Sequence, residues 1–465
     1  MRLLLAVCLA LTLPAQTPLK SLNPKVEKIV AAVSADRIAS TLRRLEGFGT
    51  RNIFSSQEHP TRGVGAAYRW IAEEMKSYSP RLQVSLDPHE LKQGGRVFRD
   101  VKIVNVVAVL PGTTQKDRHV IVSGHYDSLH IVRKKVGELE QMDQEATVAA
   151  DAPGVSDDGS GTAAVMELAR VMSQFEFEKT IVFVAFAGEE FGLLGANEYA
   201  KRARELKWVI VAVLNNDIIG NDMAGNGRSA NSAVRVFSED PIDSPSRTLA
   251  RYVKEIGERY VPSMTVNTVF RADRFGRGGD HTPFDRAGYP AVRFTTPSEF
   301  YANQHTGSDT FANASPAYAA RVTRVNGAVA AVLAWAPPAP DVLTKARSVT
   351  SGDEVDGPNL SRGKSGYDAF LKWKEVGDVT DLAGFSIVRR DSTAPYWEKE
   401  QFVGPGKEFR LVDVSVDDIV LGVKAVDREG NEIPVSVYRI VPRRLPSAEA
   451  AFTPGCCDRS GGAVG

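Results

Sequence analysis

Short apolar runs that alternate with helical stretches constrain the fold of this chain most. Strand-like runs lie at 101–110 (VKIVNVVAVL), 119–123 (HVIVS), 180–187 (TIVFVAFA), 208–214 (WVIVAVL) and 291–295. Apolar positions at helical spacing predict helices at 25–46, 63–78, 163–172, 193–204, 245–260 and 316–335. Strands that are apolar on both faces and alternate with helices indicate a covered, parallel-rich sheet. We therefore predict an α/β fold with a mixed, mostly parallel sheet sandwiched by helices.

The stretch APPAP at 336–340 predicts a stiff linker, and the pattern of apolar residues changes after it. Short runs at 370–373, 384–389, 409–412, 419–426 and 435–441 are separated by Gly, Asp and Pro, a spacing typical of an antiparallel β-sandwich. Trp373, Gly384-Phe385, GVKAVD at 422–427 and GNE at 430–432 resemble a fibronectin type III domain. We expect one domain at 20–336, this C-terminal β-sandwich at 341–444 and a flexible Gly-rich tail at 445–465.

The N-terminal stretch has the pattern of an export signal. Met1-Arg2 precedes an apolar run at 3–13, and Pro14-Ala15-Gln16 follows as a cleavage region. Eleven residues are too few to span a bilayer as a helix. We expect a signal peptide at 1–16 and a secreted or periplasmic protein without an integral membrane segment after signal removal; a buried or interfacial N-terminal helix is the alternative.

Charge and cysteine content exclude several classes of protein. The chain balances 57 Lys+Arg against 57 Asp+Glu over 465 residues, whereas a nucleic-acid binder shows a basic excess. Its three cysteines are Cys8, Cys456 and Cys457, all outside the body of the predicted fold. A disulfide framework and a cysteine-type zinc site are therefore excluded.

Acidic and imidazole side chains gather just after the predicted strands, where open α/β sheets place their ligand sites. They are His125 with Asp127, the pair Asp157-Asp158, the pair Glu189-Glu190, Asp217 and His305. Each has an ordinary alternative: SDDGSG at 156–161 is typical of a solvated turn, and two acids suit the first turn of a helix. Together, however, such groups in one crevice repel unless a cation lies among them. Oxygen and imidazole ligands without thiolate favour zinc, with cobalt or manganese as alternatives.

One motif points elsewhere. The segment GSGTAA at 159–164 matches a dinucleotide-binding fingerprint, which requires an apolar strand directly before it. The preceding residues APGVSDD are polar and turn-forming, so we reject a nicotinamide site. The small residues instead predict that a helix begins close beneath the metal site.

Six segments in order resemble the co-catalytic zinc aminopeptidase family, which includes secreted bacterial leucyl aminopeptidases, glutamate carboxypeptidases and glutaminyl cyclases. They are HYD, APGVSDDGSGTAA, FAGEEFGLLGA, NNDIIG, GGDHTPFDRAGYPA and HTGSDT. The resemblance implies two zinc ions per chain, bridged by Asp157. His125 and Asp217 would hold one ion, and Glu190 and His305 the other.

The same resemblance implies a peptide hydrolase in which Glu189 is the general base and Asp127 orients His125. It also implies that a non-proline cis bond can join Asp157 and Asp158. His281 and Tyr301 are candidate substrate contacts. Arg271, Arg274 and Arg277 are a solvated loop or, alternatively, a site for a substrate carboxylate.

We expect an aminopeptidase acting on peptides. A carboxypeptidase or glutaminyl cyclase is the alternative within the family, and a non-catalytic, receptor-like binding protein is the alternative outside it. Receptor-like members lose ligands or the base, and this chain keeps them all.

Overall fold

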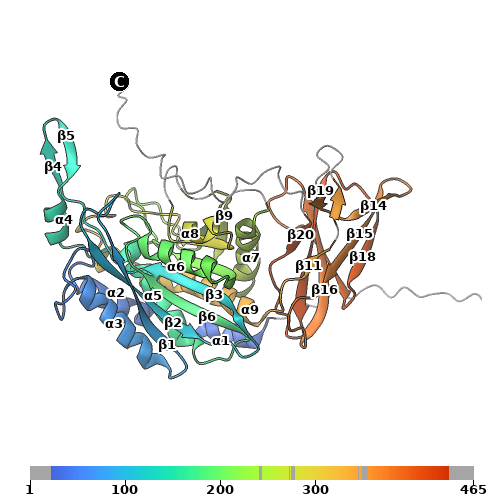
Figure 1. Ribbon diagram of the computed structural model, residues 1–465, viewed down its shortest axis with the longest axis horizontal. Coiled ribbons are helices and arrows are strands. Elements are labelled where there is room, and N and C mark those ends of the chain that lie inside the picture. The colour runs from blue at the N-terminus through green and yellow to red at the C-terminus, as the bar shows by residue number, and fades with distance from the viewer. Residues whose placement is uncertain are drawn as a thin grey trace, which may run out of the picture.

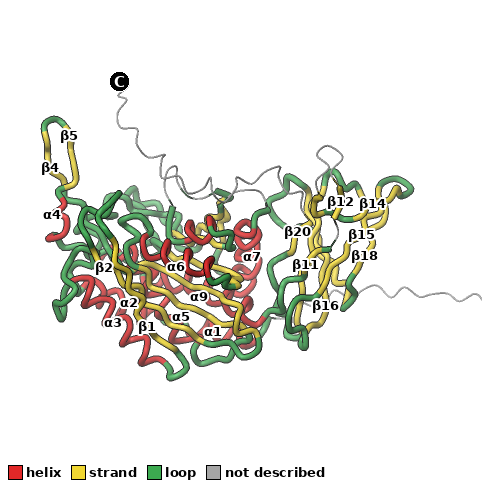
Figure 2. Tube along the Cα trace, viewed as in Figure 1, coloured by secondary structure: helices red, strands yellow, loops and turns green. Residues whose placement is uncertain are grey.

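The computed structural model describes residues 22–239, 243–271, 273, 278–343, 345–347 and 354–438. These residues form a large mixed sheet with helices on both faces, followed by smaller antiparallel sheets near the C-terminal end (Figure 1). Figure 2 shows the two regions as a helix-rich part and a part made of strands and loops. The predicted fold class is therefore confirmed.

The large sheet has eight strands, and its central strands are parallel. Their order is β1 (Gln83–Leu91), β2 (Val101–Leu110), β6 (Lys179–Phe186), β3 (Gln115–His125), β7 (Val209–Asn216), β10 (Ala291–Thr295), β8 (Ala233–Ser238) and β9 (Thr265–Val269). The pairs β6–β3, β3–β7, β7–β10 and β8–β9 are parallel, and β1–β2, β2–β6 and β10–β8 are antiparallel. The carboxyl ends of β3, β6, β7 and β10 consequently meet at one edge.

Strand β6 is buried on both faces, as its unbroken apolar sequence predicts. Ile181 and Phe183 enter one core, and Val182 and Val184 enter a second core on the opposite face. The first core is covered by α1 (Pro24–Ala32), α2 (Ala35–Glu46), α3 (Gly63–Tyr78), α5 (Ser160–Met172), α7 (Pro245–Tyr260) and α9 (Pro316–Trp335). The second is covered by α6 (Leu194–Glu205) and α8 (His281–Arg286).

The helix predicted over 25–46 is wrong in one respect, because two helices occupy this stretch. Val33 and Ser34 are extended, and the Ser34 hydroxyl accepts a hydrogen bond from the N–H of Arg37. This N-cap begins α2 and separates it from α1.

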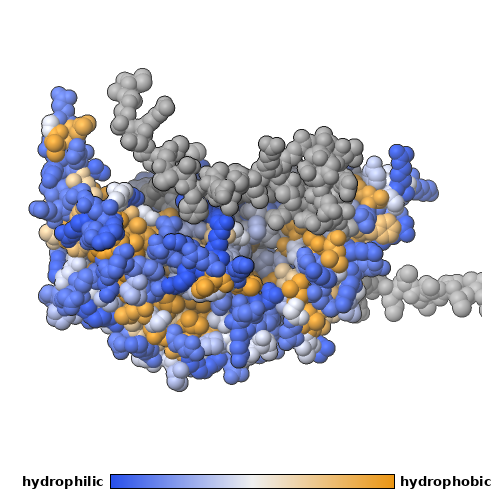
Figure 3. All heavy atoms as spheres, viewed as in Figure 1, coloured by the Kyte–Doolittle hydropathy of each residue, from blue (hydrophilic) through white to orange (hydrophobic). Residues whose placement is uncertain are grey.

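A hairpin of β4 (Arg133–Val136) and β5 (Leu139–Met142) precedes α4 (Gln144–Ala149) and projects from the body of the molecule (Figure 1). Short helical turns lie at η1 (Val155–Gly159) and η2 (Phe311–Asn313). Within the described part of the chain, no helix has both the length and the apolarity needed to cross a membrane. The face seen in Figure 3 is mainly hydrophilic, with smaller apolar areas between.

The C-terminal strands form two small antiparallel sheets that pack face to face. One contains β11 (Asp341–Val342), β14 (Asn359–Arg362), β15 (Tyr367–Lys374) and β18 (Glu408–Val414). The other contains β16 (Leu382–Asp391), β17 (Lys399–Gly404), β19 (Ile419–Asp427) and β20 (Ser436–Tyr438). A separate pair joins β12 (Lys345–Arg347) to β13 (Glu354–Asp356). Between the sheets, buried Trp373 packs on Phe385 with ring centroids 5.3 Å apart.

The fibronectin type III identity and the domain limits stay predictions. The expected signal peptide at 1–16 and the tail at 445–465 lie outside the described residues.

Candidate metal centre

Five side chains singled out from the sequence meet at the carboxyl edge of the large sheet. His125 ends β3, Glu190 follows β6, and Asp217 follows β7. Asp157 comes from η1, and His305 lies in the loop after β10. Four of them are buried, and His305 is 25% exposed at its side chain.

The five residues form two groups that share Asp157. His125, Asp157 and Asp217 make one group, and Asp157, Glu190 and His305 make the other. Within each group the candidate ligand atoms lie within 4.8 Å of one another. The Asp157-Asp158 peptide bond is cis.

The two carboxylate oxygens of Asp157 face different groups. Its Oδ1 is 3.4 Å from Nε2 of His125, and its Oδ2 is 3.3 Å from Nε2 of His305. The outer members complete each group: Oδ1 of Asp217 is 3.9 Å from Nε2 of His125, and Oε2 of Glu190 is 2.9 Å from Nε2 of His305.

The charge and hydrogen bonding of these residues fit a bound cation. Among the described residues, no group forms a hydrogen bond with buried Nε2 of His125 or Oε1 of Glu190. Glu190 also raises the pKa of His305 to about 11, which shows that the surrounding acids stabilise positive charge at this place. Buried carboxylate and imidazole donors in sets of three are the ligands that zinc uses.

A further acidic group, Glu255 with Glu400 and Glu432, also has closely spaced oxygens. The amine of buried Lys424 forms ion pairs with all three carboxylates. A lysine therefore already supplies the cation there, and the group needs no metal.

Asp127 holds the turn that carries Glu189 and Glu190. Its carboxylate accepts hydrogen bonds from the N–H groups of Gly188, Glu189 and Glu190, at 2.8, 3.2 and 3.3 Å. Nδ1 of His125 lies 3.2 Å from the backbone oxygen of Asp127 and 3.5 Å from its Oδ1. Asp127 thus fixes the backbone of the turn that carries Glu189 and Glu190, and its backbone oxygen lies against the imidazole of His125. Burial raises the pKa of half-buried Glu189 well above its usual range.

Two more buried acids, Asp158 and Asp309, accept hydrogen bonds from backbone N–H groups and are not members of the two candidate ligand groups. Asp158 accepts hydrogen bonds from the N–H groups of His125, Gly161 and Ile218, and so joins the ends of β3 and β7 to α5. Asp309 accepts the N–H groups of Ser156 and Asp157. Asp309 belongs to the HTGSDT segment, which was a signal for its importance.

Sequence reasoning missed two buried arginines. Arg51 donates to the backbone oxygens of Tyr126, Pro153 and Gly154, at 2.6, 2.6 and 2.7 Å, and so ties the loop after His125 to the loop before Asp157. Arg293 lies on β10 and pairs with Asp217, Nε to Oδ2, at 3.1 Å. Nothing in the sequence near either arginine signals these contacts.

The predicted substrate contacts are less closely tied to the five residues. His281 is fully buried at the start of α8, with Nε2 at 3.6 Å from Oε1 of Glu239. Tyr301 is 60% exposed in the turn before His305. Arg271 is exposed, and Arg274 and Arg277 lie outside the described residues.

Comparison with known families and proteins gives consistent matches. The model of peptidase family M28 matches residues 105–330. A protein of Pyricularia oryzae described as a probable zinc metalloprotease is 37% identical over 89% of this chain and 84% of its own length. One of Leptosphaeria maculans with the same description is 34% identical over 89% of this chain and 96% of its own length.

Among solved structures, the LapA aminopeptidase of Legionella pneumophila shares the fold. It superposes with a TM-score of 0.50 and 20% sequence identity, covering 70% of this chain and 78% of its own.

Proposed function

Because this chain belongs to peptidase family M28, we propose that it is a zinc metalloprotease of one particular kind, an aminopeptidase that uses two zinc ions. The zinc metalloprotease class follows from the family and its relatives. The number of ions, the residues that hold them and the exopeptidase type are the proposal. The observation that carries it is the position of Asp157, whose two oxygens face two separate groups of candidate ligands.

His125, Asp217 and Oδ1 of Asp157 would hold one ion, and Glu190, His305 and Oδ2 of Asp157 the other. Bound zinc supplies Lewis acidity, which polarises a carbonyl and makes water more acidic. The neighbouring residues of the chain support this arrangement. Arg293 occupies Oδ2 of Asp217 and leaves Oδ1 towards His125.

Glu189 is the proposed general base. It precedes the ligand Glu190, and the hydrogen bond from its N–H to Asp127 fixes its backbone. A carboxylate in this place can accept a proton from the attacking water and return it to the amine that leaves.

The first test changes Glu189 to Gln. We expect turnover to fall by roughly 10²–10⁴-fold while zinc content stays unchanged, because the amide cannot accept a proton. Zinc per chain is measured by elemental analysis beside the kinetics. Glu205→Gln, at the exposed end of α6, is the matched control and keeps full activity. Near-normal turnover in Glu189→Gln contradicts the proposed base.

The exopeptidase type is tested with a substrate panel. Aminoacyl anilides, the same compounds with an acetylated amine, acetylated peptides with a free carboxyl end, amidated peptides and peptides beginning with Gln are assayed with and without a chelator. An aminopeptidase cleaves only substrates with a free amine and loses activity with the chelator. Release of C-terminal residues from acetylated peptides indicates the carboxypeptidase instead. Loss of ammonia from N-terminal Gln without cleavage indicates the cyclase.

We further propose that the protein is exported and that 341–444 is a fibronectin type III-like domain. The pattern of 1–16 supports export, and the two packed antiparallel sheets support the domain. N-terminal sequencing of protein from the medium or periplasm tests the first proposal. A chain beginning at Met1 in the cytosolic fraction alone contradicts it.

A further inference from the structure

A pocket of about 420 Å³ lies between the large sheet and the C-terminal strands. On the sheet side it is bounded by the amino-terminal ends of β3, β6 and β7, at Arg118, Lys179 and Val209. The five candidate ligands lie at or after the opposite, carboxyl ends of the same sheet. The pocket is therefore separate from the candidate metal centre.

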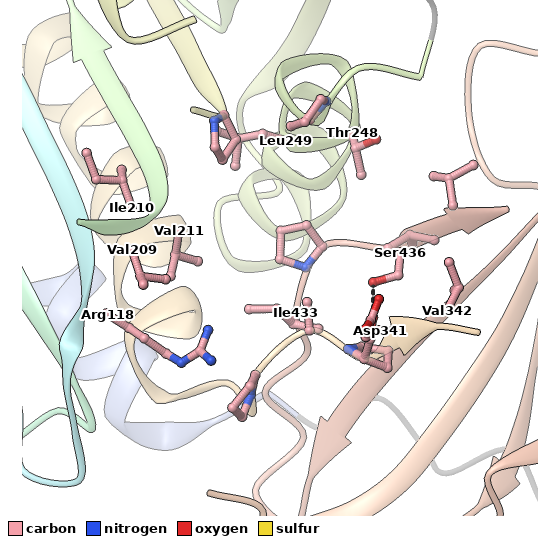
Figure 4. Close-up of a pocket in the computed structure, with 18 of the residues that line it drawn as sticks. Arg118, Val209, Ile210, Val211, Thr248, Leu249, Asp341, Val342, Ile433 and Ser436 are labelled. Carbon is pink, nitrogen blue, oxygen red and sulfur yellow. Dashed lines mark hydrogen bonds between the residues drawn. The ribbon is translucent and has the colours of Figure 1, made fainter. Parts of the chain in front are cut away.

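Most of the residues that line the pocket are apolar. In Figure 4, Val211 points from the sheet and Ile433 from the C-terminal side into the same space. Other apolar lining residues are Val209, Leu249, Pro290, Pro338, Pro340 and Val435. Small-molecule sites have this volume, favour interfaces between parts of a chain, and combine apolar walls with few polar groups.

Arg118 is the polar group that stands out. Its guanidinium projects into the pocket, and none of the described residues forms a hydrogen bond or ion pair with it. The other charged side chains of the wall have partners. Lys179 donates to the backbone oxygen of Ala336, and Asp341 pairs with Lys374 at 2.9 Å.

The remaining acid of the wall, Asp243, is likewise engaged. It accepts two hydrogen bonds of 2.7 Å from Arg390 and one of 2.9 Å from Arg251. The charge that the wall offers to a ligand is thus the positive charge of Arg118. A carboxylate matches a guanidinium with two parallel hydrogen bonds.

We propose that this pocket binds a small apolar monocarboxylate, with its carboxylate on Arg118 and its apolar body between Val211 and Ile433. Such a ligand touches both the large sheet and the C-terminal strands. Binding at this place therefore stabilises their association, because a ligand that binds only the folded, docked state adds to its stability.

Calorimetry on the zinc-loaded full chain tests the proposal with 4-phenylbutyrate and its uncharged match, 4-phenylbutanamide. We expect the acid to bind at least tenfold more tightly than the amide and to raise the melting temperature. Arg118→Gln weakens binding of the acid at least tenfold and leaves that of the amide unchanged. Val209→Trp, which fills the rim at a 41% exposed position, weakens binding of both.

Arg133→Gln, on the exposed strand β4, is the matched control and binds the acid as the unchanged chain does. Carboxylates also bind zinc, so each titration is repeated after removal of zinc and alongside a peptidase assay. Binding to the pocket survives zinc removal and does not compete with substrate. The proposal is overturned if acid and amide bind with equal affinity, or if Arg118→Gln binds the acid as tightly as the unchanged chain does. It is also overturned if neither probe binds, or if binding is lost when zinc is removed.

Discussion

Asp217, one of the candidate zinc ligands, is oriented by a single buried arginine. Its Oδ2 is held by Arg293, which also pairs with Asp273, and its Oδ1 points towards His125. The guanidinium thus leaves Asp217 one free oxygen and offsets part of the negative charge of the acids. A group that orients a ligand in this way commonly changes metal affinity by about 10–100-fold.

We therefore predict that Arg293→Met weakens zinc binding by about 10–100-fold, because Asp217 loses its fixed orientation. Competition with a zinc-binding dye measures the affinity without reference to activity. The control is Arg235→Met. Arg235 is a half-buried arginine on the neighbouring strand β8, and it pairs with Glu299. Identical zinc affinity in Arg293→Met and Arg235→Met shows that Arg293 does not position the ligand.

At the scale of the element, the start of α5 sets the spacing between helix and sheet. A Cβ on Gly161 would collide with the backbone oxygen of Asn216 and the carboxylate of Asp158. The small residues of GSGTAA thus serve close packing beneath the candidate ligands, as the sequence predicts, rather than nucleotide binding.

Gly161→Ala should accordingly lower the free energy of unfolding by about 1–3 kcal/mol, the usual cost of overpacking. Because Asp158 also holds the N–H of His125, we expect zinc content to fall as well. Urea unfolding and elemental analysis measure the two effects. Gly94→Ala is the matched control, since a Cβ there meets no atom within 4 Å. Equal stability of the two variants contradicts the close-packing argument.

Elements whose apolar residues recur in a clear pattern were the ones that the sequence could locate. The predicted stretches 101–110, 245–260, 291–295 and 316–335 coincide with β2, α7, β10 and α9, because burial produces unmistakable apolar patterns. Strands β1, β8 and β9 went unpredicted. Each lies at or near an edge of the sheet, and β1 has the sequence QVSLDPHEL, with no unbroken apolar run.

Some residues of the candidate site could likewise be predicted from the sequence, and others could not. His125, Glu190 and Asp217 follow recognisable strands, so topology alone predicts their meeting. Arg51 could not be found, because its partners are backbone oxygens as far as 103 residues away. Contacts to backbone leave no pattern in the side chains of the partners.

At the scale of the whole molecule, a buried lysine joins the C-terminal strands to the helical part. Lys424 of β19 is 2% exposed and pairs with Glu255 of α7 and with buried Glu432. Removing one member of a buried ion pair leaves an uncompensated charge, which costs more than the pair contributes.

Lys424→Met should therefore lower the free energy of unfolding by about 3–5 kcal/mol. Urea unfolding followed by fluorescence measures the change. The double variant Lys424→Met/Glu432→Gln should recover part of the loss, because one of the three carboxylates that face the amine is then neutral. Arg259, which also pairs with Glu432, keeps its ion pair with Glu255 in this variant. A single variant as stable as the unchanged chain, or a double variant no better than the single, contradicts this role.

Lys179 gives the same junction a dependence on pH. It begins β6, is fully buried, and donates to the backbone oxygen of Ala336 in the segment that leads to the C-terminal strands. Burial lowers the pKa of Lys179 to about 7, against 10.5 for the ordinary side chain. Between these two values the unfolded chain holds a proton that the folded chain lacks. The contribution of Lys179 to stability is thus fully present above pH 10.5 and is lost as the pH falls through 7.

The last prediction follows from this difference. From pH 7.5 to 9.5, the free energy of unfolding of the unchanged chain should rise relative to that of Lys179→Met, by up to about 1.4 kcal/mol per pH unit. Urea unfolding at several pH values measures the difference, in which groups common to both proteins cancel. Lys135→Met, on the exposed hairpin, should give a flat difference, because the Lys135 side chain is in contact with solvent in the folded chain as well. If the Lys179→Met difference is flat as well, the amine is not buried, and the junction is looser in solution than the contact between Lys179 and Ala336 implies.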